Sequence, residues 1–307
     1  MKYINYFFMI LLLILLLGIL ILIIDYLRIN IFYKINENMY KEEFLVQGNK
    51  NGYIPQGLTY SDKYEIYIQT SYNKKHSNSK IYITDKNYKF IKELELVNNN
   101  SHVGGITNNN DLVFITSDYK VFIYKLDDIV NSKNKIEYID SYELPVRGDF
   151  SYYKNNILWI GDFFLNPFYP VPNNNPLLMG YDINNLDYNK PSYVISLPKM
   201  VQGMEIDENN RFIFTSSFTY LINSKLSIYK NVLEEKNEYY ELNNNKIPYY
   251  KFNKNNLVKT ITLPPMAEGI VYKDDKLYIL FESSSSSYSI AYPRLDHVLS
   301  IKKQELK

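Results

Sequence analysis

The N-terminal part of the chain contains one long hydrophobic run. Residues Phe7 to Ile24 carry no polar side chain and are mostly Leu and Ile. At about 1.5 Å of rise per residue, a helix of this length nearly crosses the roughly 30 Å hydrocarbon core of a bilayer. A helix on the surface of a globular domain would have a polar face, and this one has none. The pattern therefore predicts a transmembrane helix within residues 1–27.

A cleaved signal peptide is the alternative interpretation of this run. Its apolar region would be shorter, and a cleavage site of small residues should follow it. No Ala precedes Ala267, and the segment from Asp25 to Lys34 offers no such site. We therefore expect an uncleaved anchor, a linker over residues 28–42 and a folded domain over residues 43–307.

The charges beside the run leave its orientation nearly undetermined. Lys2 and the terminal amine precede the run, while Arg28 and Lys34 follow it, so the positive-inside comparison is almost even. We expect the C-terminal domain on the outer side of the cell membrane, by analogy with other signal-anchored domains.

From residue 43 onward the chain repeats a short pattern. A Leu or Leu-Pro is followed by a short polar segment and then by the sequence residue–Gly–apolar residue. We call this last sequence the glycine step. Successive steps lie roughly 43 to 66 residues apart, a spacing typical of propellers and other repeat arrays. The glycines of the five steps are Gly57, Gly105, Gly148, Gly203 and Gly269.

Each glycine step is followed by a turn rich in Asn, Asp and Lys and then by β-type runs. Ile66–Ile68 and Val113–Ile115 are examples, dominated by β-branched and aromatic residues. A third run follows in each unit and a fourth run in the first four, and Ser289–Tyr292 is the expected third strand of the last unit. Two insertions, residues 163–176 and 232–248, are expected to be surface loops.

The last unit lacks a fourth strand, and the start of the domain offers one. Glu43–Val46 lies before the first glycine step, where a fourth strand should be. Pairing this strand with the last unit would close the ring and remove an exposed sheet edge. The sequence therefore predicts an all-β fold, a five-bladed β-propeller closed by an N-terminal strand and preceded by one transmembrane helix. A six-bladed propeller with a degenerate blade and a sandwich are the alternatives.

Composition excludes several classes of function. The formal net charge is +1, so no basic surface for nucleic acid is expected. The absence of cysteine removes disulfides, thiolate metal sites and Cys nucleophiles. Neither a G-x-S-x-G elbow nor a phosphate-binding glycine motif is present. The 32 tyrosines are typical of an AT-rich genome and carry no binding inference.

Polar residues beside the repeat glycines are the candidate site. Innermost strands of a propeller converge on its channel, and ligands bind at one mouth. Glu268, Asp149 and His102 are the candidate catalytic groups. An unpaired, desolvated Glu268 would suit acid–base chemistry, whereas pairing with Arg147 would hold it ionised. The expected ligand-binding residues are Gln56, Arg147, Gln202, Asp162 and Glu282.

Asp162 and Glu282 belong to a second group, at the ends of the second strands. Gln69 and Asp118 occupy the same position in other units. The insertion over residues 163–172, dense in aromatics and prolines, would form a lip over this mouth or pack on the side of the propeller. A plug of hydrogen-bonded side chains is the alternative to a binding site.

Two short segments resemble known propeller families. Residues 55–60, Pro-Gln-Gly-Leu-Thr-Tyr, followed by Ile66-Tyr67, are similar to the repeat opening of plant-type glutaminyl cyclotransferases, which are five-bladed. In that family an acidic residue commonly ends the next strand, where this chain has Gln69. Residues 267–270, Ala-Glu-Gly-Ile, resemble the opening of gluconolactonase-type propellers, which are six-bladed. That resemblance implies a divalent metal in the channel, bound by Glu268.

These observations support two hypotheses about function. The first is an extracytoplasmic propeller that binds a small polar ligand or peptide at its channel mouth, as an enzyme of the cyclotransferase or lactonase type. The second is a non-catalytic cell-surface scaffold that binds a protein or glycan through the aromatic insertion.

Overall fold

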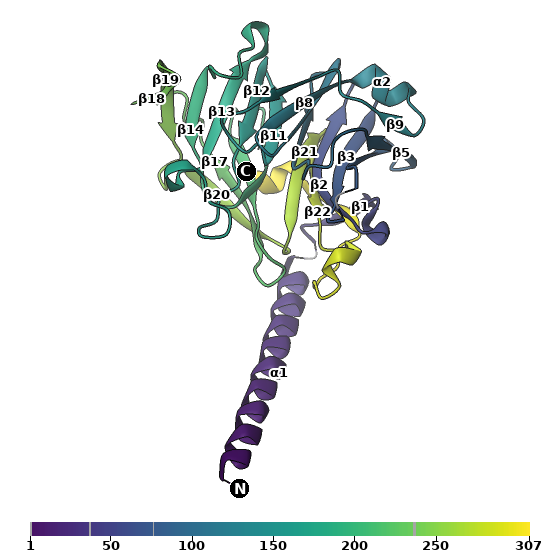
Figure 1. The fold of residues 1–307 in the computed structure, drawn as a ribbon, viewed down its shortest axis with the longest axis vertical. Coiled ribbons are helices and arrows are strands. Elements are labelled where there is room, and N and C mark those ends of the chain that lie inside the picture. The colour runs from purple at the N-terminus through teal and green to yellow at the C-terminus, as the bar shows by residue number, and fades with distance from the viewer. Residues whose placement is uncertain (1, 37, 76, 236–237) are drawn as a thin grey trace. The chain divides into compact units, whose positions relative to one another are not determined.

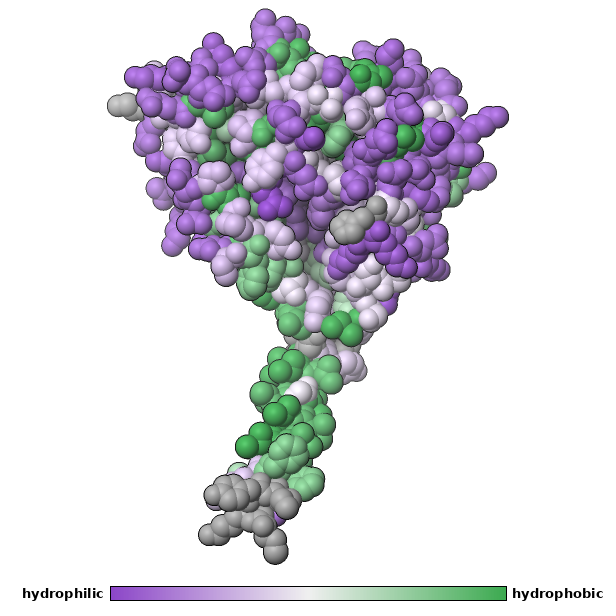
Figure 2. Space-filling model, viewed as in Figure 1, coloured by the Kyte–Doolittle hydropathy of each residue, from purple (hydrophilic) through white to green (hydrophobic). Residues whose placement is uncertain are grey.

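The computed structural model describes residues 2–36, 38–75, 77–235 and 238–307, which form two compact units, Met1–Lys41 and Glu42–Lys307 (Figure 1). The first unit is the helix α1 (Lys2–Asn36). Its stretch Asn5–Ile24, 20 residues, is long and apolar enough to cross a membrane, and none of it is buried. Figure 2 shows the apolar side chains that surround this helix. The helix also includes residues 28–36, which the sequence assigned to the linker.

The second unit is a five-bladed β-propeller, as the repeat predicted (Figure 1). Five sheets surround a central channel, and each contributes one inner strand. Each inner strand contacts the inner strands of the two neighbouring blades, so the ring is closed. The inner strands of blades one to five are β2 (Tyr53–Ser61), β6 (Gly105–Asn108), β11 (Phe150–Lys154), β15 (Val201–Ile206) and β21 (Ala267–Lys273).

Three further strands complete each blade from the inside outward. The second strands are β3 (Ile66–Asn73), β7 (Leu112–Ser117), β12 (Ile157–Gly161), β16 (Phe212–Ser216) and β22 (Lys276–Phe281). The third strands are β4 (Lys80–Asp85), β8 (Lys120–Lys125), β13 (Leu177–Asp182), β17 (Ser224–Tyr229) and β23 (His297–Lys302). The outer strands are β5 (Phe90–Leu96), β10 (Asp140–Glu143), β14 (Tyr193–Ser196), β20 (Leu257–Leu263) and β1 (Lys41–Leu45).

The hydrophobic core lies between neighbouring blades. Strand residues alternate between the two faces of a sheet, so each blade can bury one apolar set against each neighbour. Ile68 and Ile83 of blade one, for example, share a buried cluster with Val113 and Ile115 of blade two. A short helix, α2 (Leu126–Asn131), follows β8 and adds Leu126 and Ile129 to this cluster.

The N-terminal strand closes the ring, which confirms the prediction. β1 lies beside β23 in the last blade, and Val46 N donates to Asp296 O at 2.9 Å. The prediction for the third strand of this blade was wrong, because that strand is β23 and not Ser289–Tyr292. Pro293 follows the latter segment directly, and a proline has no N–H to donate within a central strand.

The second insertion is also not a simple loop. β18 (Glu238–Leu242) and β19 (Asn245–Lys251) form a hairpin, and β19 pairs in parallel with β14 of blade three. Asn243 and Asn244 make its two-residue turn, both with positive φ, which Asn tolerates. A two-residue strand, β9 (Lys135–Ile136), extends blade one in the same manner, in parallel with β5. Short 3-10 turns are η1 (Asn49–Asn51), η2 (Pro172–Asn174), η3 (Ile183–Asn185), η4 (Ser286–Tyr288) and η5 (Lys303–Leu306).

Candidate functional site

The repeat glycines allow the inner strands to touch backbone to backbone. A Cβ on Gly269 would lie 2.6 Å from Leu58 N, and one on Gly203 would lie 2.7 Å from Glu268 O. Both separations are shorter than real Cβ contacts, so only glycine fits at these positions. The polar residues directly before these glycines are therefore held at one level of the channel.

A cavity of about 210 Å³ opens at the end of the channel where the inner strands begin. We call it the amino mouth. All five blades contribute to it, and seven of the eight predicted site residues line it. Its lining is Gln56, Tyr72, His102, Asp118, Arg147, Asp149, Phe163, Tyr169, Gln202, Phe218, Glu268, Glu282 and Tyr288.

Asp162 is the predicted site residue that does not line the cavity. Its buried carboxylate accepts the backbone N–H groups of Arg147, at 2.7 Å, and Leu177, at 3.1 Å. Burial raises the pKa of Asp162 to about 7, although these two bonds favour the ionised form. Asp162 thus fixes the backbone that presents Arg147 to the cavity.

Two buried carboxyl groups from blade five lie in the cavity wall. Glu268 is 2% exposed and Glu282 is 9% exposed. Gln202 Nε2 donates to Glu268 Oε1 at 3.2 Å, and Gln56 Nε2 donates to Glu282 Oε2 at 3.2 Å. The Tyr288 hydroxyl also bonds to Glu282. Each glutamate is therefore positioned by a side chain from another blade.

Burial and mutual repulsion keep protons on this pair. Burial raises the pKa of Glu268 well above its ordinary value, and the nearby charges of Glu282 and Asp149 raise it further. Burial also raises the pKa of Glu282 to about 7. Glu268 therefore keeps its proton to higher pH than an ordinary carboxyl group, and Glu282 is partly ionised near neutral pH.

Arg147 pairs with Asp149 and not with Glu268. Its Nε lies 3.2 Å from Asp149 Oδ2, which also accepts the Phe163 N–H at 2.7 Å. Burial raises the pKa of Asp149 to about 6, and the Arg147 charge opposes that shift. The structure thus leaves Glu268 desolvated and without Arg147, the arrangement that favours acid–base chemistry.

His102 is a neutral member of the cavity at physiological pH. Burial lowers the pKa of its imidazole to about 4. Its ring packs on Tyr72, with centroids 4.4 Å apart, and its backbone N–H points to Asp118 Oδ2 at 3.4 Å. His102 can therefore accept or donate a hydrogen bond, but it does not supply a positive charge.

The aromatic insertion contributes directly to the cavity wall. Phe163 and Tyr169 both line it, with ring centroids 5.3 Å apart, and the Arg147 guanidinium lies 5.6 Å from the Tyr169 ring. Of the two positions expected for this insertion, the structure shows the lip. Phe218, after β16, also lines the cavity and stacks on Phe168.

The divalent metal implied by the gluconolactonase resemblance has no preformed site. Within the described ranges, no group of three His, Asp or Glu side chains is placed to hold an ion. Arg147 already neutralises Asp149, one of the two carboxyl groups whose charge acts on Glu268. Metal binding therefore stays a prediction of that resemblance.

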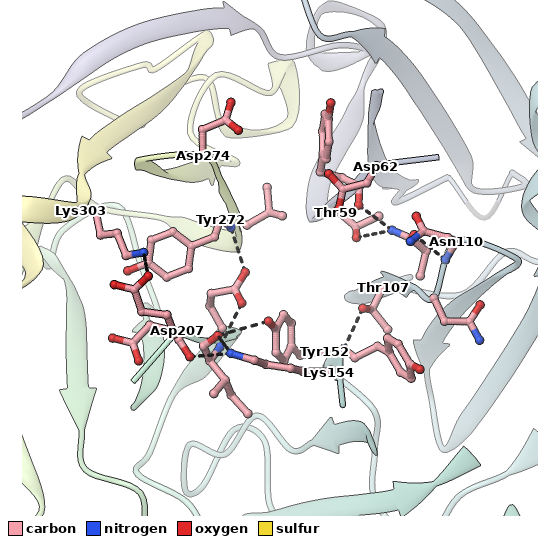
Figure 3. Close-up of a pocket in the computed structure, with 18 residues that line it drawn as sticks. Thr59, Asp62, Thr107, Asn110, Tyr152, Lys154, Asp207, Tyr272, Asp274 and Lys303 are labelled. Atoms are coloured by element: carbon pink, nitrogen blue, oxygen red, sulfur yellow. Dashed lines mark hydrogen bonds and ion pairs between the residues drawn. The ribbon is translucent and has the colours of Figure 1, made fainter. Parts of the chain in front are cut away.

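A second cavity, of about 410 Å³, lies where the inner strands end, and sequence reasoning missed it (Figure 3). We call it the carboxyl mouth. It shares no lining residue with the amino mouth. Glu205 is one of its buried acids, and a charge between the apolar residues Met204 and Ile206 of β15 was the available signal. The lining is Thr59, Tyr60, Asp62, Thr107, Asn108, Asn109, Asn110, Tyr152, Tyr153, Lys154, Glu205, Ile206, Asp207, Glu208, Val271, Tyr272, Asp274 and Lys303.

The charged groups of the carboxyl mouth already have backbone or ion-pair partners. Glu205 accepts the backbone N–H groups of Ile206, at 3.0 Å, and Tyr272, at 2.9 Å. Lys154 Nζ donates to the carbonyl of Ile206 at 2.9 Å (Figure 3). Lys303 pairs with Glu208 at 2.6 Å. This mouth resembles a hydrogen-bonded plug, so the amino mouth is the better candidate site.

Comparison with known proteins finds similar solved structures but no family. No family model and no curated protein matches the chain. A luciferin-regenerating enzyme is 10% identical with a TM-score of 0.46, over 85% of this chain and 92% of that one. The PQQ-bound aldose sugar dehydrogenase of Streptomyces coelicolor is 12% identical with a TM-score of 0.49, over 85% and 96%. BamB of Moraxella catarrhalis is 8% identical with a TM-score of 0.33, over 81% and 82%.

Proposed function

We propose that this chain is a membrane-anchored, extracytoplasmic β-propeller that binds a small polar ligand or peptide end in its amino mouth. The helix α1 would be the anchor, and all five blades would supply binding groups. The main support is the convergence of seven residues, distant in sequence, on one cavity that contains the Glu268–Glu282 pair.

The glutamate pair suits general acid–base catalysis. A protonated Glu268 near a partly ionised Glu282 would leave one carboxyl group able to donate a proton and the other able to accept one. Glu268 has the carboxyl group with the more strongly raised pKa, so it would be the donor. Glu282 would be the acceptor.

The reaction class that we propose is acyl transfer by an amine or water. The nucleophile forms a bond to a carbonyl carbon and gives its proton to Glu282. The C–N or C–O bond to the leaving group breaks, and the leaving group takes the proton of Glu268. Arg147 and Gln202 would orient the substrate through their N–H groups, and Gln56, whose amide N–H groups already bond to Pro55 and Glu282, would hold Glu282 in place. Both the cyclotransferase and the lactonase reactions follow this scheme.

Turnover by the full-length chain in lipid nanodiscs tests this proposal. An N-terminal glutaminyl peptide and a simple lactone are the two substrates, assayed by ammonia release and by acid release. We expect Glu268→Gln to lower turnover at least about a hundredfold, because the acid is lost. Glu205→Gln is the matched control, a buried glutamate of the other mouth. Equal turnover in the wild type and Glu268→Gln would contradict the assignment.

A non-catalytic scaffold is the second candidate, and the exposed lip favours it. Phe168 is 69% exposed and Phe218 is 39% exposed, and their rings stack at 6.1 Å. Exposed aromatic side chains are frequent anchors of protein interfaces. If this surface binds a partner, Phe168→Ser should abolish capture of that partner by the full-length protein. Tyr239→Ser, at a residue 67% exposed on the hairpin of blade three, should have no effect. Equal capture by both variants would reject the scaffold.

A further inference from the structure

Glu268 and Glu282 differ from the other buried acids in how their charge is compensated. Buried ionised groups normally have a cation or strong hydrogen-bond donors. Asp162 and Glu205 each accept two backbone N–H groups, and Asp207 pairs with Arg211 at 2.7 Å. The pair in the amino mouth has only side-chain amides and one tyrosine hydroxyl. In the described part of the chain, no Lys or Arg forms an ion pair with either glutamate.

The walls around this pair already attract cations. Lys74 Nζ lies 4.4 Å from the centroid of the Tyr288 ring, and the Arg147 guanidinium lies 5.6 Å from that of Tyr169. Aromatic faces hold cations through their quadrupole, most strongly where water is excluded. Each of these two contacts covers one face of a tyrosine ring. Tyr72, Phe163 and Phe218 add further apolar surface to the cavity wall.

The charge of the cavity is negative. Its ionisable lining consists of Asp118, Asp149, Glu268 and Glu282 against Arg147, with His102 neutral. Arg147 is already paired with Asp149, and Lys74 acts on Glu282 from outside the lining. A positive ligand would therefore gain both from the net charge and from the uncompensated pair.

From these contacts we infer that the amino mouth binds an organic ammonium ion. The positive nitrogen lies against the carboxyl groups of Glu268 and Glu282, and its alkyl groups lie against Tyr72, Phe163 and Phe218. The combination of carboxylate and aromatic walls is the chemistry that recognises choline and similar ions. This inference rests on the proposed function and specifies the ligand class of the same site.

Binding of such an ion should release a proton. Burial holds protons on Glu268 and Glu282 to higher pH than usual, and a cation beside them favours the ionised form of both. The titratable groups that face the pair are Asp118, Asp149, His102, Tyr72, Tyr169 and Tyr288, and the fixed charges are Arg147 and Lys74.

Calorimetry on the full-length chain in nanodiscs tests the inference. The probes are choline and its neutral isostere 3,3-dimethyl-1-butanol, which has the same shape without the charge. We expect choline to bind at least about tenfold more tightly than the alcohol. Titrations near pH 7, in buffers of different ionisation enthalpy, should show net proton release. Glu282→Gln should weaken choline binding about tenfold or more, and the control Glu205→Gln should not change it.

The inference is overturned if the alcohol binds as tightly as choline, if millimolar choline does not bind, or if Glu282→Gln leaves its affinity unchanged. These outcomes are separable from failure of the proposed function. Turnover of a neutral lactone that depends on Glu268 would support the site even where choline fails. Choline binding that depends on Glu282, without any turnover, would support the ligand class and reject the catalysis.

Discussion

At the scale of single residues, the amino mouth depends on carboxyl groups that stay protonated to unusually high pH. Glu268 and Glu282 are both buried, and no Lys or Arg in the described ranges forms an ion pair with either of them. The isolated sequence indicated Glu268 because it precedes a repeat glycine. It could not show that Arg147 pairs with Asp149 instead of with Glu268, because that pairing depends on a 3.2 Å contact between folded side chains.

The pH dependence of stability should reveal this pair. A carboxyl pKa raised from 4.5 to about 7 in the folded protein means that the native state keeps a proton that the unfolded chain has lost. Stability therefore falls as pH rises through this window, by at most about 1.4 kcal/mol per pH unit for one group. The pKa of His102 is lowered to about 4 in the folded protein, so this residue has the opposite effect. It makes stability rise with pH between about 4 and its ordinary pKa.

Glu282→Gln removes one of the titrating groups, so the loss of thermal stability between about pH 5 and pH 8 should shrink by several degrees. Thermal unfolding of the full-length chain in nanodiscs at both values measures this. An unchanged pH dependence would show that Glu282 has an ordinary pKa.

At the scale of elements, the closing strand β1 determines whether the ring is complete. Glu43 on β1 is buried, and its Oε1 lies 2.9 Å from Lys276 Nζ and 2.7 Å from Ser300 Oγ. Phe44 beside it packs on Tyr67, with ring centroids 4.8 Å apart. The position of β1 in the repeat was readable from the sequence, since a fourth strand was missing at one end and present at the other.

Glu43→Gln should destabilise the propeller by about 1–2 kcal/mol, because it removes the charge that pairs with the partly exposed Lys276 ammonium. Denaturant unfolding of the full-length chain in nanodiscs provides the measurement. Glu238→Gln, which breaks the exposed pair with Lys251 on the hairpin, should change stability little. Similar losses of stability in both variants would mean that the Glu43–Lys276 ion pair stabilises the propeller no more than an exposed pair does.

At the scale of the whole molecule, the proposed function requires the propeller to lie outside the cell. The chain contains no cysteine, so a single introduced thiol reports on its own side of the membrane. Asn189→Cys places this thiol at an exposed turn of blade three. Lys2→Cys places it before the apolar run.

A membrane-impermeant maleimide applied to intact cells should label Asn189→Cys and should label Lys2→Cys only after lysis. The charge balance around the run is almost even, so this experiment decides what the positive-inside comparison leaves open. The reverse labelling would place the propeller in the cytoplasm and exclude the extracytoplasmic part of the proposal.

The sequence by itself determined the apolar helix, the five blades and the residues beside the repeat glycines. Those features follow from local periodicity and from a repeat in which equivalent positions must converge on one axis. Only the tertiary structure decided that β23 is the third strand of the last blade, that a hairpin extends blade three and that a second polar cavity lies at the carboxyl mouth. It also decided which charges are compensated, because pairing depends on distances of a few ångströms between side chains from different blades, and no spacing along the chain sets them.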